Sequence, residues 1–434
     1  MSADDFADSD FAGLDWFRAG DAYQDPYPYY DWLRAHGPVW PEPKRGVFMV
    51  TGYEEAVAIY NDTDTFSSCN AVSGPLVPFP EPFVGDDVSD VIDRHRDVLI
   101  FSDQLPTFDP PEHTAHRGLL LRLITPKRMK ANEEFMWRAA DAQIDEFLAR
   151  GECEFLHDYA GPFTLLVVAD LLGVPEEDHD LFRRQLQGGE RPEGAGAKGA
   201  PSHKPLEFLY DRFTAYIEDR RRDPQDDVMT ELATATFPDG TLPDVHDIML
   251  ISANLFSAGG ETTARLLGTA MRYLGERPEL QEQLRADRTK IPAFIEECVR
   301  LQSPLQGSFR MARRRTTIGD VEIPAGSSLF VMAGAANRDP RLHHDPAVLD
   351  IDRVNGRQHV GFGWGAHACV GAPLARAEGR ATLERVLDRM LDIRIAEAHH
   401  RDPAGAFGEW QYHYEPIFLL RGLDALHLEF TPAG

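Results

Sequence analysis

The sequence predicts a mainly α-helical chain with a small β-rich lobe, which is an α+β fold. Residues 242–275 form the longest helix candidate, which would span roughly 50 Å at 1.5 Å per residue. The apolar stretch Phe163-Thr-Leu-Leu-Val-Val-Ala169 is too short to cross a membrane and favours a buried helix. Short apolar runs that suit strands lie mainly within residues 36–60 and 310–335, so the β-rich lobe is expected there.

The elements follow in chain order from local patterns. Residues 25–34 are expected to be the first helix, because prolines stand before it or in its opening turn. Apolar runs at 39–40 and 47–50 favour strands, and residues 53–60 favour a helix. Residues 69–108 contain too many prolines for regular structure and predict a long irregular segment.

The second half of the chain has its own signals. The stretch 187–201 is rich in Gly and Ala and predicts a mobile loop. Residues 317–326 and 328–332 alternate like two strands around a turn. A helix is expected to run from the segment after residue 371 to about Met390, and residues 416–420 and 426–430 are expected to form a closing hairpin.

The length of 434 residues would suffice for two or three average domains. No linker rich in Pro, Gly or Ser separates them, so a single domain over residues 1–434 is expected. The net charge of −27, from 44 basic and 71 acidic residues, argues against nucleic acid or an anionic membrane as partner. The four cysteines lack zinc or disulfide spacing, and the polar, acidic N-terminus lacks a signal peptide or apolar anchor, so a cytoplasmic protein is expected.

One cysteine, Cys369, stands among glycines just ahead of a helical pattern. Gly363, Gly365 and Gly371 permit tight turns and a close approach to a flat ligand. Pro373 suits the first turn of the helix that follows. A sulfur near a helix N-terminus has a lowered pKa and can ligate a metal as a thiolate. A lone cysteine is more often a buried hydrophobe, but this setting favours the metal ligand.

The run Phe362-Gly-Trp-Gly-Ala-His-Ala-Cys-Val-Gly371 resembles the haem-binding signature of the cytochrome P-450 monooxygenases, in their soluble bacterial form. The resemblance implies the cytochrome P-450 fold, with haem b (iron protoporphyrin IX) between the long central helix and the cysteine loop. It implies that Cys369 is the proximal iron ligand, whose electron density favours O–O cleavage. Phe362 would pack beside the sulfur, His367 would bond a haem propionate, and Gly371 would belong to the same cofactor-binding loop.

Two further segments resemble the propionate-binding parts of that family. His113 and Arg117 are four residues apart, so both project from one helical face, and two donors there suit a carboxylate pair. Arg310, at the entry to a strand, would bind a propionate. Each residue alone would more often be a solvated surface charge.

The long helix contains Ala258-Gly-Gly-Glu-Thr-Thr263. Two glycines inside a helix cost about 1 kcal/mol each against alanine, so something should compensate. By resemblance the helix opens at Ala258 and Gly259 beside the haem, and Glu261 and Thr262 relay protons for O–O cleavage. Many relatives have Asp where Glu261 stands. A kinked core helix is the simpler alternative.

A structural triad is also implied by the resemblance. Glu297 and Arg300 are three apart on one helix, and Arg353 matches the later arginine of the family's triad. The triad would hold the haem-ligand loop and take no part in the chemistry. An isolated pair of this kind is usually surface decoration.

Substrate and partner residues are predicted as well. Asn254, Ser257, Gln306 and Ser308 are candidates for contacts with the substrate's polar groups. Residues 113–132 contain basic residues and no acidic residue, so they form a basic patch. Such a patch favours an acidic electron donor of the ferredoxin type. The patch consists of Arg122, Lys127, Arg128 and Lys130.

The resemblance implies a haem-dependent monooxygenase that inserts one oxygen atom of O2 into a hydrophobic substrate, such as a terpenoid, steroid or fatty-acid derivative. Electrons would come from NAD(P)H through a ferredoxin reductase and a ferredoxin. Three alternatives stay open: a peroxide-driven or rearranging haem-thiolate enzyme, a non-catalytic haem sensor or ligand carrier, and a haem-free helical scaffold. The pair Glu261-Thr262 argues against the first two, because neither peroxide chemistry nor sensing requires it.

Overall fold

The computed structural model describes residues 11–187, 204–401 and 410–433. The chain divides into two compact units, which we describe separately. Unit 1 comprises Met1–Arg117, Val299–Cys369 and Pro416–Arg421, and unit 2 comprises Gly118–Cys298, Val370–Glu415 and Gly422–Gly434. The expected single domain stays a prediction. Residues 1–10 and 188–201, to which two expectations above refer, lie outside the described residues.

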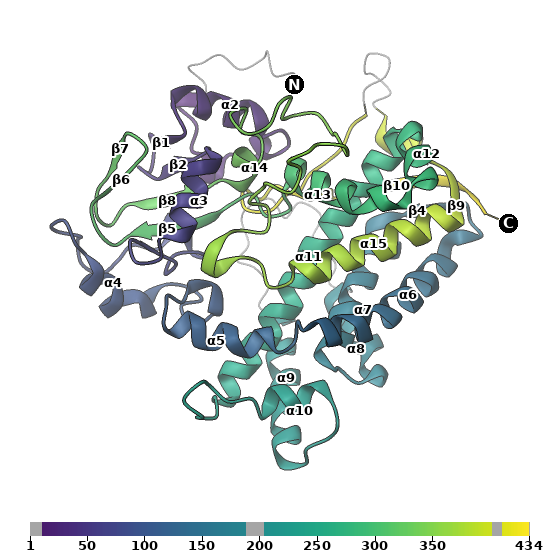
Figure 1. Cartoon of the computed structure of the whole chain (residues 1–434), viewed down its shortest axis with the longest axis horizontal. Coiled ribbons are helices and arrows are strands. Elements are labelled where there is room, and N and C mark those ends of the chain that lie inside the picture. The colour runs from purple at the N-terminus through teal and green to yellow at the C-terminus, as the bar shows by residue number, and fades with distance from the viewer. Residues whose placement is uncertain (1–10, 188–203, 402–409, 434) are drawn as a thin grey trace. The chain divides into compact units, whose positions relative to one another are not determined.

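Unit 1 combines short helices with the predicted β-rich lobe (Figure 1). Its helices are α2 (Tyr27–His36), α3 (Tyr53–Asn61), α4 (Ser89–His95) and α14 (Ala333–Ala336). Its strands are β1 (Val39–Pro41), β2 (Phe48–Val50), β3 (Phe66–Ser67), β5 (Ser308–Ala312), β6 (Thr316–Ile318), β7 (Val321–Ile323) and β8 (Ser328–Val331). Two helices, α5 (Glu112–Leu121) and α13 (Ile291–Gln302), begin in one unit and end in the other.

Within the described residues, the main sheet of unit 1 has five strands in the order β1-β2-β8-β5-β3. Strand β2 pairs with β8 in parallel, and the other neighbours pair antiparallel. The rings of Phe309 and Phe330 stack across β5 and β8 with centroids 4.6 Å apart, which buries the centre of the sheet. Strands β1, β2, β6, β7 and β8 lie within the expected ranges 36–60 and 310–335.

The expected strand pair between residues 317–326 and 328–332 is wrong. The turn lies inside the first stretch, where β6 pairs with β7 through Thr317 and Glu322. Strand β8 joins the main sheet instead, because both of its edges are occupied by β2 and β5. Both stretches show the same alternation of apolar and polar residues. This pattern indicates that each stretch is a strand, but it does not indicate which strand each one pairs with.

Unit 2 is mainly helical, and α11 packs against α7, α9 and α15. Its helices are α6 (Pro126–Leu148), α7 (Gly161–Leu172), α8 (Glu176–Gln187), α9 (Lys204–Arg222), α10 (Val228–Ala233), α11 (Val245–Glu276), α12 (Pro278–Ala286), α15 (Ala372–Arg389) and α16 (Glu397–His400). A capping box of Asp244 and Asp247 starts α11, and Gly173 ends α7 in the left-handed conformation with φ 72°. The predicted long helix, the apolar helix and the helix that ends near Met390 are confirmed.

A three-stranded sheet closes unit 2 in the described part of the chain, in the order β4-β10-β9. These strands are β4 (Glu152–Glu154), β9 (Met390–Ile395) and β10 (His427–Pro432). Because β4 and β9 occupy both edges of β10, the expected hairpin between 416–420 and 426–430 does not form. Leu420 bridges Leu305 instead, within unit 1.

Helices α6 and α15 run side by side in Figure 1 and are joined by ion pairs on their outer faces. Arg380 pairs with Glu133, Arg385 pairs with Asp141, and Arg389 pairs with Asp141 and Asp145. Pairs at this level of exposure contribute under about 1 kcal/mol each. They fix the register of α15 on α6 more than they add stability. No helix among the described residues is long and apolar enough to span a bilayer.

Candidate active site

The loop that carries Cys369 turns back on itself. The backbone N–H of Cys369 donates a hydrogen bond to the Phe362 carbonyl at 2.7 Å. Gly363 and Gly365 have φ of 66° and 65°, which side chains rarely tolerate. A Cβ at Gly365 would also stand 2.6 Å from the Tyr60 carbonyl oxygen. Glycine is therefore required twice in this loop, whereas Gly371, the N-cap of α15, has an ordinary φ of −77°.

Cys369 differs from the other cysteines in its exposure. Cys69, Cys153 and Cys298 are buried, and Cys369 is exposed. Burial raises the pKa of Cys69 to about 11 and also raises the pKa of Cys153 and of Cys298. A buried neutral thiol is inert, so in the described part of the chain Cys369 is the cysteine that can present a thiolate to a ligand.

Four predicted cofactor-binding residues come together beside this loop in unit 1. Arg117 donates from Nη2 to the Ala368 carbonyl at 2.5 Å, one residue before the cysteine. The rings of His113 and His367 lie 3.9 Å apart, and His367 Nε2 is 3.1 Å from Ser68 Oγ. Arg310 is buried, and its guanidinium lies 5.2 Å from the centre of the Tyr60 ring.

The polar atoms of this cluster have few protein partners. Neither ring nitrogen of the buried His113 forms a hydrogen bond. Within the described part of the chain, Arg310 donates to the Ser308 hydroxyl at 3.3 Å and to the Phe309 carbonyl at 2.6 Å and to no other acceptor. Among the described residues neither Arg117 nor Arg310 forms an ion pair. Buried donors without acceptors are unfavourable, so the cluster suits a ligand that brings its own carboxylates.

The two histidines are neutral N–H donors at ordinary pH. Burial, with the charge of Arg117, lowers the pKa of His113 to about 4. Burial and the charges of Arg310, His113 and Arg117 lower the pKa of His367 to about 2. Two guanidinium cations and two neutral imidazoles thus fit the two propionates of a haem, and the cysteine beside them supplies the kind of ligand that haem iron takes.

The predicted relay residues lie on α11 in unit 2. Glu261 and Ala258 are exposed, and Ser257 and Thr262 are half-buried. The Thr262 hydroxyl donates to the Ala258 carbonyl at 2.7 Å. The helix continues through this stretch without a break, so the opening implied by the resemblance is not seen in the backbone. A related feature is the hydrogen bond from the Thr262 side chain to a helix carbonyl.

Gly259 has a packing role that the sequence did not indicate. A Cβ at Gly259 would meet Val168 Cγ2 on α7 at 2.8 Å, so glycine lets the two helices approach. The Thr164 hydroxyl of α7 also donates to the Gly260 carbonyl at 3.0 Å. Close helix packing is therefore what compensates for the low helix propensity of Gly259. Its contact with the cofactor stays a prediction.

The four predicted substrate contacts differ in what their polar atoms do. Gln306 donates to the carbonyls of Gln302 and Ser303 and accepts from the Tyr30 hydroxyl, so both of its N–H donors are used inside the fold. Ser308 bonds Tyr60 and Arg310, at 3.1 and 3.3 Å. Both side chains therefore have structural partners, and their contacts with a substrate stay predictions.

Asn254 remains a candidate for a substrate contact. Its Nδ2 is buried without a hydrogen bond, and it lies one turn before Ala258 on α11. Ser257, three residues after Asn254 on the same helix, is half-buried. An unpaired buried amide is unfavourable unless a ligand or water satisfies it.

The arginines of the predicted triad converge on one segment of unit 1. The buried Arg300 donates to the carbonyls of Pro346 and Val348, at 2.7 and 3.2 Å. Arg353 donates to the same Val348 carbonyl at 3.1 Å and to His344 at 2.6 Å. Glu297 is buried three residues earlier on α13. The two arginines brace the segment before the cysteine loop, which agrees with a structural role.

The basic patch is smaller than the sequence indicates. Arg122, Lys127 and Lys130 are exposed. Arg128 forms an ion pair with Glu231, which the fold brings from α10. The absence of acids along residues 113–132 could not exclude an acid from a distant part of the chain, so Arg128 is corrected to a paired residue.

Glu378 is a candidate that the sequence analysis missed. It is fully buried on α15, and neither carboxyl oxygen has a hydrogen bond of normal geometry. Burial raises its pKa well above the ordinary value, although the nearby Thr263 side chain opposes this. A carboxyl held neutral so close to Thr263 is a proton-bearing group inside unit 2. Glu378 stands four residues after Leu374, which places it on the apolar face of the helix. This position was the signal in the sequence that could have indicated its burial.

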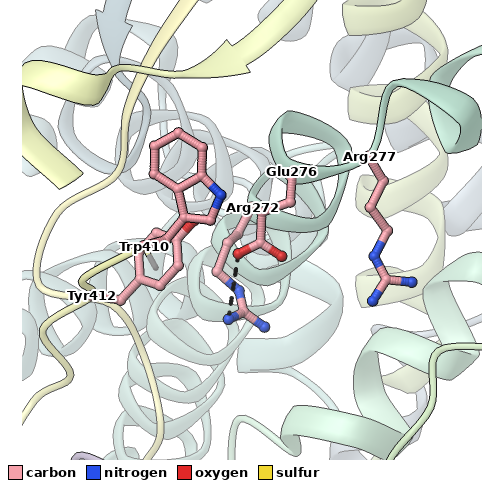
Figure 2. A pocket seen from close by; sticks show the side chains of 5 residues that line it. All are labelled: Arg272, Glu276, Arg277, Trp410 and Tyr412. Atoms are coloured by element: carbon pink, nitrogen blue, oxygen red, sulfur yellow. Dashed lines mark ion pairs between the residues drawn. The ribbon is translucent and has the colours of Figure 1, made fainter. Parts of the chain in front are cut away.

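A separate cavity of about 500 Å3 lies at the C-terminal end of α11 (Figure 2). It is lined by Arg272, Glu276, Arg277, Trp410 and Tyr412. The Arg272 guanidinium is 3.8 Å from Glu276 and 5.3 Å from the centre of the Tyr412 ring. The positive charge of Arg272 is therefore balanced by residues of the cavity lining itself. Ten residues of helix, about 15 Å, separate Arg272 from Thr262, and no predicted site residue lines this cavity. Within the described ranges, no group of three or more His, Cys, Asp or Glu side chains is arranged to hold a metal ion.

Comparison with known proteins places these features in a family. The family model described as Cytochrome P450 matches residues 203–391. Cytochrome P450 144 of Mycobacterium tuberculosis is 33% identical over 426 residues, covering 95% of this chain and 90% of that protein. Cytochrome P450-terp of Pseudomonas sp. is 30% identical over 395 residues, covering 85% and 88%.

Solved structures of cytochromes P450 are similar to this chain over almost its whole length. The substrate-free Mycobacterium marinum cytochrome P450 CYP150A6 matches with a TM-score of 0.91 and 51% identity, covering 98% of this chain and all of the other. CYP109E1 of Bacillus megaterium, in complex with corticosterone, matches with a TM-score of 0.78 and 26% identity, covering 95% and 100%. A relative 33% identical across nearly its full length is close enough to share the fold and the chemistry of the cofactor. This chain therefore belongs to the cytochrome P450 family and is a haem b-dependent monooxygenase.

Proposed function

We propose that this enzyme inserts one oxygen atom of O2 into a hydrophobic small organic substrate of terpenoid, steroid or fatty-acid type. NAD(P)H supplies two electrons through a ferredoxin reductase and a ferredoxin, and two protons convert the second oxygen atom to water. Corticosterone bound to the Bacillus megaterium relative and the name of the Pseudomonas relative support this range of substrates.

The cluster of two arginines and two histidines beside an exposed cysteine carries the proposal, because neither arginine has an acidic partner among the described residues and His113 has no hydrogen bond there. Cys369 is the iron ligand, and Arg117, His113, Arg310 and His367 hold the two propionates. Haem, when bound, supplies the activation of dioxygen and the transfer of oxygen to the substrate. The loop keeps the sulfur in place because its N–H is bonded to the Phe362 carbonyl, so little reorganisation is needed when iron binds.

Glu261 and Thr262 are proposed to deliver the protons. Glu261 is exposed and can take protons from water, and the Thr262 hydroxyl, one residue on, can accept a proton while its own is held by Ala258 O. General acid–base groups of this kind typically contribute about 10²–10⁴-fold. Asn254, with its unpaired Nδ2, is proposed to fix a polar group of the substrate.

The proposal is tested by binding and turnover. Testosterone, hexadec-9Z-enoic acid and α-terpineol are titrated into the ferric enzyme, and displacement of water from iron is followed by the change of spin state. A probe that binds is then turned over with NADPH, a bacterial [2Fe–2S] ferredoxin and its reductase, or with hydrogen peroxide alone. Oxygenated product with the ferredoxin system supports the proposal. Product with peroxide only would identify the peroxide-driven alternative, and no product in either assay would contradict oxygen insertion into these classes.

The basic patch is proposed as the docking surface of the ferredoxin. In the double variant Arg122→Glu, Lys130→Glu, reduction by ferredoxin should slow about tenfold at low salt, because like charges now face the acidic partner, and the difference should shrink at high salt. Arg128→Gln is the matched control, because Glu231 already offsets the charge of Arg128. Stopped-flow reduction measures both rates. Equal slowing by the control would mean that the patch acts through stability and not through docking.

Acid should destabilise the haem-free protein through His113. Its pKa is about 4 in the fold and near 6.5 when unfolded, so the unfolded chain binds the proton first as the pH falls. Stability from this group is full above about pH 6.5 and decreases down to about pH 4, by about 3 kcal/mol at most. Chemical denaturation across this range checks the sign. His113→Gln should make the decrease smaller, with the rest due to other buried histidines such as His367. His344→Gln, at an exposed site, should leave the decrease unchanged.

A further inference from the structure

One arginine on α11 is shared between two carboxylates of unequal exposure. Arg265 Nη2 is 2.6 Å from Glu415 Oε2, and both side chains are about nine-tenths buried, with 11% and 10% exposed. Arg265 Nη1 is 3.3 Å from Glu261 Oε2, and the Glu261 side chain is 64% exposed. The contact with Glu415 is therefore the short, desolvated one, and the contact with Glu261 is the long, solvated one.

The buried pair is fixed by the backbone around it. The Glu415 N–H donates to the Gly422 carbonyl at 3.1 Å, and Tyr414 bridges Leu423, so the two strands of this turn are held together. A Cβ at Gly422 would stand 2.4 Å from Arg265 Cγ, which means that the arginine stem lies directly on this glycine. Arg265 is thus held in a slot that only glycine leaves open, with Glu415 at its end.

These contacts determine how tightly Glu261 is held. A nearly buried guanidinium must have a counter-charge, because an uncompensated charge away from water is strongly unfavourable. Glu415 already supplies that counter-charge, so the charge of Arg265 is neutralised without a close contact to Glu261. Without Glu415, the same guanidinium would have Glu261 as its only carboxylate partner among the described residues, and it would bind Glu261 much more tightly.

We propose that Glu415 is a positioning residue for the proton relay: by neutralising Arg265 it leaves Glu261 loosely held and free to turn toward Thr262. This rests on the proposed relay function of Glu261. In each delivery Glu261 gives a proton to the Thr262 hydroxyl, which passes one on to the oxygen being reduced, and Glu261 is then reprotonated from water. Arg265 orients Glu261 between these events and takes no proton itself.

The test compares Glu415→Gln with the double variant Arg265→Gln, Glu415→Gln in the ferredoxin-driven assay with NADPH. In Glu415→Gln, kcat should fall about tenfold. The solvent deuterium isotope effect on NADPH consumption and the fraction of oxygen released as peroxide should both rise. The spin-state titration with testosterone and the carbonyl spectrum should be unchanged, because neither reports proton delivery. The double variant removes the arginine that would trap Glu261, so it should recover kcat to within about twofold of the parent.

Glu397→Gln is the matched control, because it breaks an exposed ion pair with Arg401 on the same unit. It should change none of these readouts. A double variant as slow as Glu415→Gln would overturn the inference, since a structural role predicts no rescue. If Glu415→Gln does not retain haem, the double variant decides alone: a rate near the parent supports the inference, and a rate as low as that of Glu261→Gln overturns it. Full activity of Glu261→Gln would instead remove the relay function itself, and the two failures are thereby distinguished.

Discussion

The variant Cys369→Ala is expected to lose the red-shifted band of its reduced carbonyl complex and all oxygen insertion. Alanine has no atom that can bind iron, and among the described residues the other cysteines are buried with pKa values raised by burial. The proposed propionate-binding residues Arg117, His113, Arg310 and His367 are unchanged in this variant, so some haem should still bind without the thiolate. Absorption spectroscopy of the ferrous carbonyl complex measures the outcome.

Cys298→Ala is the control for this experiment. Cys298 is fully buried on α13. The Cys298→Ala variant should retain the red-shifted band, because the substitution only removes a small apolar contact. A red-shifted band that persisted in Cys369→Ala would show that another group ligates the iron. In that case the assignment of the whole loop would have to be abandoned.

Thr262→Ala is expected to reduce product formation by about 10–100-fold while NADPH consumption continues. The missing hydroxyl breaks the path from Glu261, so oxygen should leave as peroxide in place of water. The same change removes only one bond within the helix, from Thr262 Oγ1 to Ala258 O, so the fold should persist. The ratio of product to NADPH consumed and the peroxide released are the two measurements.

Thr262→Ser provides the comparison, because it keeps the hydroxyl and loses only a methyl group. It should retain most of the coupling between NADPH and product. If Thr262→Ala made product as efficiently as the parent, proton delivery by this residue would be excluded. Glu378, the buried acid beside Thr263, would then be the next group to test.

The features that the sequence predicted well depend on short-range rules. The Cys369 loop is set by glycines at fixed places, and the shared face of His113 and Arg117 follows from helical spacing. The long helix α11 follows from its apolar pattern and its capping box. Each of these depends on residues only a few positions apart, which is the range over which a pattern carries structural information.

The contacts that the sequence did not indicate come from distant parts of the chain. Arg128 was placed in the basic patch, whereas Glu231 on another helix forms an ion pair with it. Gln306 was proposed for substrate contact, whereas the Tyr30 hydroxyl uses its amide oxygen. Glycines in α11 were assigned to the cofactor, whereas Gly259 meets Val168 of α7. Nothing in the local sequence indicates such partners, because they are fixed only when the helices and strands pack.

The contact between Gly259 and Val168 constrains the order in which these two positions can evolve. Val168 is buried and β-branched, so its methyl groups cannot rotate aside to admit a new Cβ. A change from glycine must therefore be preceded by a smaller residue on the neighbouring helix. The reverse order passes through an intermediate with overlapping atoms, so only one of the two mutational routes is open to descendants of this sequence.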